Sequence, residues 1–258
     1  MLGSAVVDEM LSTDKAWEKL GRRDPYFGVL ADEKFSTSKI LENRDEFFQT
    51  GRQTIAHIIK RYEAHFGSLP RGLALDHGCG VGRLALPLAQ EFENALGLDV
   101  SPSMIAEAKT NAEQFGVPNV QFLLADDELS NALGQFDFVN SYMVLQHIPV
   151  RRGLPIISRL IDKVSPGGGF HIHFSLRSDG LASRSLWWAS HHIPGVKIWQ
   201  NICAGRDWNA PGMQMNNYPL NKLAMIMAAH SIRESALLTE HHGKFLTCSL
   251  IGRKPDRD

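Results

Sequence analysis

The chain has 258 residues, of which 43% are hydrophobic and 21% charged, and its 27 basic and 28 acidic residues leave a net charge of −1. This composition suits a globular protein with one sizeable α/β domain, and the lack of a basic excess argues against a nucleic-acid partner. No apolar run approaches the ~20 residues that a membrane helix needs, and the N-terminus has no signal-peptide pattern. We therefore expect no membrane partner and a cytoplasmic protein, consistent with three widely spaced cysteines.

The N-terminal quarter of the chain favours helices. Residues 40–66 repeat apolar side chains at helical spacing, and residues 14–39 favour a helix and a loop laid over the core. We expect residues 1–66 to form a helical cap on a main domain that spans residues 67–258.

From residue 73 onward, short apolar runs alternate with helical patterns, which predicts a parallel α/β sheet. Ser101 and Pro102 are the expected N-cap and first residue of a helix that Gly116 ends. The expected helices span about 84–92, 102–115 and 149–164, and the expected strands span 73–76, 95–100, 120–125, 136–142 and 170–175.

The alternation stops after the fifth strand. Residues 176–219 have no clear period and contain Trp187, Trp188, Trp199 and Trp208. A helix at 220–230 and two strands at 231–240 and 244–254 follow, and the short link between these strands predicts an antiparallel hairpin. The expected fold is a Rossmann-like, doubly wound, seven-stranded sheet with a terminal antiparallel hairpin, an N-terminal helical cap and an insertion at 176–219.

The stretch ALDHGCGVGR at residues 74–83 places three glycines directly after the first strand, and Asp99 ends the second strand 21 residues after Gly78. A strand, a glycine turn, a helix and a second strand ending in an acid are typical of nucleotide binding, with the acid on a ribose. A dinucleotide fingerprint needs glycine at position 83, where Arg83 stands, and the G-K-[ST] of a P-loop is missing. The turn therefore favours a ligand with a modest anionic end over a pyrophosphate.

Five segments in register resemble the motifs of class I S-adenosylmethionine-dependent methyltransferases, most closely the small-molecule, ubiquinone-biosynthesis-like group (methyltransferase types 11, 12 and 25). They are Leu75–Gly82, GLDVSPSMIAEA from Gly97, Leu124–Asp127, FDFVNSYMVLQHIP from Phe136 and SPGGGFHIHF from Ser165. The resemblance as a whole covers roughly residues 40–252. The run Asn140-Ser141-Tyr142-Met143 differs from the Asn/Asp-Pro-Pro-aromatic run of DNA amino-methyltransferases.

The resemblance implies S-adenosyl-L-methionine as cofactor and assigns its contacts position by position. Two assignments have simple alternatives, because Met104 could be a core residue and Asp127 a helix N-cap. Arg52 is a candidate partner of the cofactor carboxylate, or else an exposed helix arginine. The implied contacts are Asp76, Gly78, Cys79 and Gly80 on the methionine part, Asp99 on the ribose, Val100 or Met104 on the adenine face, Asp126 with the Asp127 backbone on the adenine edge, and Asn140 and Ser141 near the sulfonium.

Methyl transfer to an alcohol needs removal of a proton, for which histidine is well suited. His147 follows the fourth strand at the ligand-binding edge, and we predict that it is the general base or orients the acceptor; the alternative is a loop brace. His173 on the fifth strand is a second candidate for acceptor contact, and we expect it to face the same side as His171. The doublets His191-His192 and His241-His242 lack metal-ligand spacing, so no metal site is expected.

We expect a methyltransferase for a small-molecule acceptor, with a hydroxyl of a glycan or specialised metabolite as target. The tryptophan-rich insertion suits a sugar ring or an aromatic molecule, although it could simply anchor itself to the core. The alternatives are an N-methyltransferase for a small amine, a non-catalytic adenosylmethionine-binding protein, and a nicotinamide-dependent dehydrogenase, which Arg83 disfavours. The oligomeric state stays open.

Overall fold

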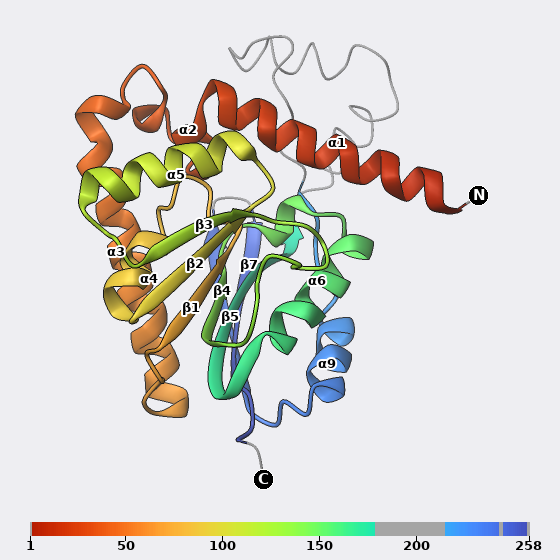
Figure 1. The fold of residues 1–258 in the computed structure, drawn as a ribbon. Coiled ribbons are helices and arrows are strands. Elements are labelled where there is room, and N and C mark those ends of the chain that lie inside the picture. The colour runs from red at the N-terminus through yellow and green to blue at the C-terminus, as the bar shows by residue number, and fades with distance from the viewer. Residues whose placement is uncertain (1, 179–214, 243–244, 257–258) are drawn as a thin grey trace.

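The computed structural model describes residues 2–178, 215–242 and 245–256. Its centre is a seven-stranded sheet of order β3-β2-β1-β4-β5-β7-β6 (Figure 1). Strands β1 to β5 pair in parallel, whereas β7 runs antiparallel between β5 and β6, which confirms the predicted fold class and its terminal hairpin. The strands are Leu73–His77 (β1), Asn94–Asp99 (β2), Val120–Leu124 (β3), Phe136–Ser141 (β4), Val164–Ser178 (β5), Ser235–His242 (β6) and Phe245–Arg253 (β7).

Helices cover both faces of the sheet, with α3, α4 and α5 on one face and α6 and α9 on the other (Figure 1). None of the helices within the described residues combines the length and apolarity needed to cross a bilayer. The helices are Leu2–Arg23 (α1), Pro25–Val29 (α2), Ile40–Phe66 (α3), Ala85–Glu91 (α4), Pro102–Phe115 (α5), Val150–Asp162 (α6) and Leu220–Ala229 (α9), with 3₁₀ turns at Glu33–Phe35 (η1) and Leu145–His147 (η2).

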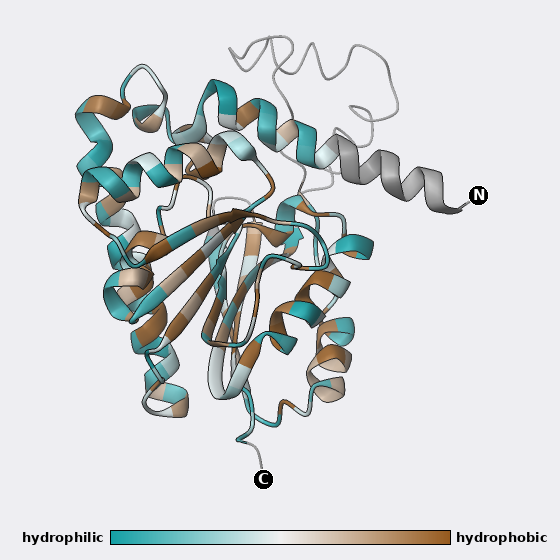
Figure 2. Cartoon of the chain, viewed as in Figure 1, coloured by the Kyte–Doolittle hydropathy of each residue, from teal (hydrophilic) through white to brown (hydrophobic). Residues whose placement is uncertain are grey.

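The alternation of side chains along the strands creates two cores. Figure 2 shows hydrophobic residues along the strands and on the helix faces that pack against them. On β5, Phe170 and Ile172 are fully buried on the α6 side. The intervening His171 and His173 face the opposite side, as predicted from the period of two. The sheet therefore carries buried histidines on the face that meets Tyr142.

Helix α5 begins and ends where the sequence indicated. The side chain of Ser101 accepts a hydrogen bond from the Met104 amide at 3.1 Å, Pro102 follows as the first helical residue, and Gly116 ends the helix in the left-handed region at φ 62°. The predicted insertion, with its four tryptophans and the doublet His191-His192, lies almost entirely outside the described residues.

Candidate functional site

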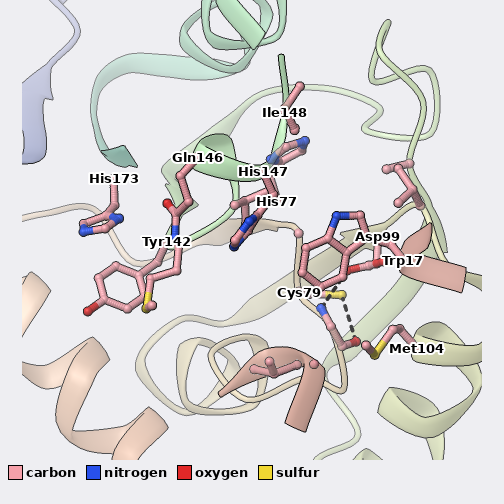
Figure 3. Close-up of a pocket in the computed structure, with 18 of the residues that line it drawn as sticks. Trp17, His77, Cys79, Asp99, Met104, Tyr142, Gln146, His147, Ile148 and His173 are labelled. Atoms are coloured by element: carbon pink, nitrogen blue, oxygen red, sulfur yellow. Dashed lines mark hydrogen bonds between the residues drawn. The ribbon is translucent and has the colours of Figure 1, made fainter. Parts of the chain in front are cut away.

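A cavity of about 290 Å³ opens at the carboxyl ends of the parallel strands, where β1 lies between β2 and β4. The strand order reverses at this point, so the helices that follow β1 and β4 leave on opposite faces and a crevice forms between them. Helix α1 and the loop after α2 supply further lining residues. Figure 3 shows the residues around the cavity: Asp99, Met104 and Cys79 at one end, and His173, Tyr142 and Gln146 at the other.

The glycine turn after β1 forms one wall. Gly78 and Gly80 adopt φ of 74° and 53°, which side-chain-bearing residues rarely adopt. The amides of Gly78 and Cys79 donate to the Leu98 carbonyl at 2.7 and 2.9 Å. The turn is thereby folded against the end of β2, and Gly78, Cys79 and Gly80 all line the cavity, as their predicted role requires. Burial raises the pKa of the Cys79 thiol well above its usual range, which fits a packed side chain.

Asp99, at the end of β2, is held by backbone amides on both sides. The Gly80 amide donates to Oδ2 and the Ser101 amide to Oδ1, each at 2.9 Å. Burial raises the pKa of this carboxyl to about 6. The carboxylate is fixed in orientation and retains lone pairs for hydroxyl donors in the cavity. Val100 and the buried Met104, both predicted for an adenine face, line the same end.

Asp76 and Arg83 place a buried acid and a buried base beside the glycine turn. Asp76 is 2% exposed and Arg83 4% exposed, and both line the cavity. Nη1 of Arg83 donates to Oγ1 of Thr50 at 3.3 Å, whereas Nε has no hydrogen-bond partner in the part of the chain that the structure describes. A buried donor without a partner is costly, so this Nε suits an acceptor on a ligand.

Burial raises the pKa of Asp76 to about 7, while the Asn140 hydrogen bond and the Arg83 charge act in the opposite direction. The ordinary pKa of an aspartic acid is 3.8. Between about pH 4 and 7, Asp76 is therefore protonated in the folded protein but ionised in the unfolded chain. The contribution of this group to stability therefore falls as the pH rises through that window. A cation beside Asp76 would favour its charged form.

Asn140 and Ser141 lie behind the cavity wall and do not line it. Asn140 is in register with Asp76 on β1 and with His171 on β5. Its Nδ2 donates to Asp76 at 2.7 Å, and its Oδ1 is 2.8 Å from Nδ1 of His171, whose Nε2 is 2.9 Å from the Ser249 hydroxyl. Burial lowers the pKa of His171 to about 3, so the ring is neutral and donates from one nitrogen only. Asn140 thus positions Asp76. That Asn140 and Ser141 lie near the sulfonium stays a prediction.

The loop after β3 contributes Asp126 and Asp127 to the lining. Asp126 is exposed, and the Ser130 amide donates to its Oδ1 at 2.9 Å, which lowers its pKa. Both carboxylate oxygens of Asp127 accept from Nε of Arg152, at 2.8 and 2.7 Å. The side chain of Asp127 is therefore engaged by Arg152, whereas that of Asp126 is exposed at the edge of the cavity.

Helix α1 is fastened over this end of the cavity by two polar clusters. Arg152 donates to both oxygens of Asp14, at 2.8 and 3.0 Å. Four donors surround Glu18, which accepts from the Ser101 hydroxyl, from the amide and hydroxyl of Ser103 and from Nε of Arg22. Burial acts to raise the pKa of Glu18, but these hydrogen bonds outweigh it and lower the pKa to about 2. Trp17 lies between the two anchored carboxylates in sequence and lines the cavity.

The two predicted catalytic histidines both line the cavity, His147 beside Trp17 and His173 at the end away from Asp99. His147 ends η2, and its ring packs edge-on against Trp17 with ring centres 5.0 Å apart. His173 lies 4.8 Å from the Tyr142 ring. Both are among the labelled side chains around the cavity in Figure 3. The structure therefore brings together His147 and His173 from β4–α6 and β5, as the sequence order suggested.

Arg52 is not brought to the cavity. It is exposed on α3, and its Nε donates to Oε1 of Gln49 at 2.7 Å. The buried cation beside the glycine turn is Arg83, for which the sequence predicted no ligand contact. Its place directly after the glycine motif was the available signal. Trp17 and Gln146 also line the cavity without having been predicted, and Trp17 belongs to no motif.

Comparison with known proteins identifies relatives of the central region. Residues 74–168 match the family described as "Methyltransferase domain". A stretch of 109 residues is 34% identical to the magnesium-protoporphyrin O-methyltransferase of Synechocystis sp. and covers 42% of this chain and 47% of that protein. The ubiquinone biosynthesis O-methyltransferase of Acinetobacter baylyi is 31% identical over 115 residues, which are 44% of this chain and 47% of that protein. The chain spans about half the length of the curated relatives it matches.

Among solved structures, magnesium protoporphyrin IX methyltransferase from Synechocystis with bound SAH has a TM-score of 0.60 against this chain. The alignment covers 97% of this chain and 100% of that one at 19% sequence identity. At this identity the likeness establishes a common fold.

Proposed function

Residues 74–168 belong to the methyltransferase domain family, and from this premise we propose that the protein transfers the methyl group of S-adenosyl-L-methionine to a hydroxyl of a small molecule. The observation that carries the proposal is the pattern of charge in one cavity. Asp76 and Arg83 form a buried acid and base at the glycine turn, and Asp99 lies at the end of the neighbouring strand. This pattern is complementary to a zwitterionic amino acid joined to a ribose diol.

The residues present fit this cofactor without a phosphate-binding loop. The Asp76 carboxylate suits the ammonium of the methionine part, and the unpartnered Arg83 Nε suits its carboxylate. Asp99 would accept hydrogen bonds from the ribose hydroxyls, and Met104 and Val100 would pack on the adenine. The bound cofactor supplies an activated methyl group on a positively charged sulfur.

The protein then has to align the acceptor oxygen with that methyl group and remove its proton. We propose that His147 accepts this proton. His147 lines the cavity, and its ring packs against the Trp17 ring in a T-shaped arrangement. His173, on the adjacent strand, contacts the acceptor together with Tyr142. A neutral imidazole at the ligand-binding edge of the sheet is suited to accept a proton from an alcohol near neutral pH.

The lining residues from the end of β4, from β5 and from β7 contain no acid, lysine or arginine among those that the structure describes. An uncharged acceptor is therefore preferred, such as an alcohol on a glycan or on a specialised metabolite. The two curated relatives named as O-methyltransferases support oxygen over nitrogen as the methylated atom.

Thermal melting in the presence of S-adenosyl-L-methionine, S-adenosyl-L-homocysteine or NAD tests the cofactor assignment, because a ligand of the folded state raises the melting temperature. We expect both adenosyl compounds to raise it and NAD to leave it unchanged. A rise with NAD alone would refute the proposal.

A metabolite screen for release of S-adenosyl-L-homocysteine then identifies the acceptor. With that acceptor, His147→Asn should lower turnover by roughly 10²-fold or more, the usual scale for a general base. The exposed His57→Asn is the matched control and should leave turnover unchanged. Turnover of His147→Asn within a few-fold of the parent would remove His147 from the mechanism.

A further inference from the structure

Gln146 carries a buried amide oxygen for which the methyl-transfer scheme gives no use. The residue lies in η2 next to His147, is 3% exposed and lines the cavity. Its Oε1 has no hydrogen-bond partner in the described part of the chain. Buried amide oxygens are nearly always paired, so one that lines a ligand cavity indicates a donor on the ligand.

Backbone hydrogen bonds fix the main chain of Gln146 in its turn. The Gln146 carbonyl accepts from the Asn216 amide at 2.6 Å and from its Nδ2 at 3.2 Å. The neighbouring amides of His147 and Ile148 close the 3₁₀ turn on Val144 and Leu145 at 2.9 Å each. The main chain of Gln146 is therefore fixed next to the cavity, so its side chain starts from a set position.

The surroundings of Gln146 are mainly aromatic, and the guanidinium of Arg83 lies 5.9 Å from the centre of the Tyr142 ring. In Figure 3 its amide lies between the pair formed by Tyr142 and His173 and the two histidines His77 and His147. The Tyr142 and His173 rings are 4.8 Å apart, tilted by 50°, and both line the cavity. Aromatic walls beside a buried amide oxygen without a partner suit a ring that bears an O–H or N–H group.

We propose that Gln146 is a specificity-determining residue that accepts a hydrogen bond from an O–H or N–H group on the methyl acceptor, an uncharged molecule with a planar ring. The proposal rests on the proposed function, because it assigns this end of the cavity to the acceptor. An otherwise identical molecule without the donor leaves Oε1 buried and unpaired, and the site discriminates against it for that reason.

Phenol and anisole are a suitable pair of probes, because they share a ring and differ in that only phenol donates a hydrogen bond. Their dissociation constants are measured by NMR titration, with and without saturating S-adenosyl-L-homocysteine. We expect phenol to bind the parent protein about tenfold more tightly than anisole. In Gln146→Met, which keeps the length of the side chain, this ratio should fall to about one. In the control Gln121→Met, an exposed position on β3, it should stay near ten.

The side-chain amide resonance of Gln146, assigned through its loss in Gln146→Met, provides a direct readout. Phenol should shift this resonance and anisole should not. If Gln146 had only a structural role, phenol and anisole would not differ in their effect on it. The proposal would be overturned if the ratio of the anisole and phenol dissociation constants were equal in the parent and in Gln146→Met. It would also be overturned if saturating phenol left the Gln146 amide resonance unmoved, or if phenol did not bind. Calorimetry with S-adenosyl-L-homocysteine on the same samples reports separately on the cofactor assignment, so the two failures are distinguishable.

Discussion

Replacement of Arg83 by methionine tests how the cavity holds the amino-acid part of the cofactor. In the structure Arg83 is 4% exposed, and its Nε has no hydrogen-bond partner among the described residues. A hydrogen bond to a charged group contributes about 1.5–3 kcal/mol. The dissociation constant of S-adenosyl-L-homocysteine should therefore increase roughly 10- to 150-fold in Arg83→Met.

A second ligand separates this effect from general damage to the site. 5′-Methylthioadenosine shares the adenosine and sulfur of S-adenosyl-L-homocysteine but has no amino-acid tail. Isothermal titration calorimetry should show that Arg83→Met binds it within about twofold of the parent, a difference worth less than 0.5 kcal/mol. Asp99→Asn should weaken the binding of both ligands, because we propose that its carboxylate binds the ribose hydroxyls.

Arg52→Met is the matched control, since Arg52 is exposed and bonded to Gln49. It should leave both affinities unchanged. The reasoning is refuted if Arg83→Met binds S-adenosyl-L-homocysteine as tightly as the parent does, or if the loss of affinity follows Arg52 instead.

Three further predictions concern the groups around this site. Because the pKa of Asp76 is about 7, S-adenosyl-L-homocysteine affinity should rise roughly fourfold between pH 6.5 and 8, and Asp76→Asn should abolish that rise in calorimetry. Asn140→Leu leaves the Asp76 oxygen and the His171 nitrogen without their partner, and we expect chemical denaturation to show a loss of about 1–3 kcal/mol per unpaired group. Arg152→Met leaves Asp14 and Asp127 unpaired, and should lower the free energy of unfolding by about 3 kcal/mol and expose α1 to proteases. A flat pH profile, or parent-like unfolding curves for the two variants, would contradict the respective assignments.

The fold and the resemblance to class I methyltransferases could be predicted from the sequence because their signals are local. The N-cap Ser101 and the C-terminal Gly116 fix the ends of α5, and the alternation on β5 places His171 and His173 on one face. The glycine motif and Asp99 lie on neighbouring strands, so their meeting follows from a parallel sheet.

The position of Arg52 depends instead on packing between distant segments. A Cβ atom at Gly51 would lie 2.1 Å from the Arg83 carbonyl, so α3 lies directly against the glycine turn at this residue. With Gly51 facing the turn, the next side chain, Arg52, points to solvent. This contact has no sequence signal apart from the glycine itself.

The role of Asn140 is also set across the sheet. It lies in register with Asp76 and with His171, which come 64 residues earlier and 31 residues later in the chain. The motif placed Asn140 at the correct end of β4. The partners of its side-chain amide depend on the strand register, and no local sequence pattern specifies that register.

A crystal structure of the protein with S-adenosyl-L-homocysteine tests the central claim most directly. We predict that the amino-acid tail lies between Asp76 and Arg83 and that both ribose hydroxyls lie within hydrogen-bond distance of Asp99. A cavity that excludes this compound and binds NAD instead, or a ribose placed away from Asp99, would contradict the account.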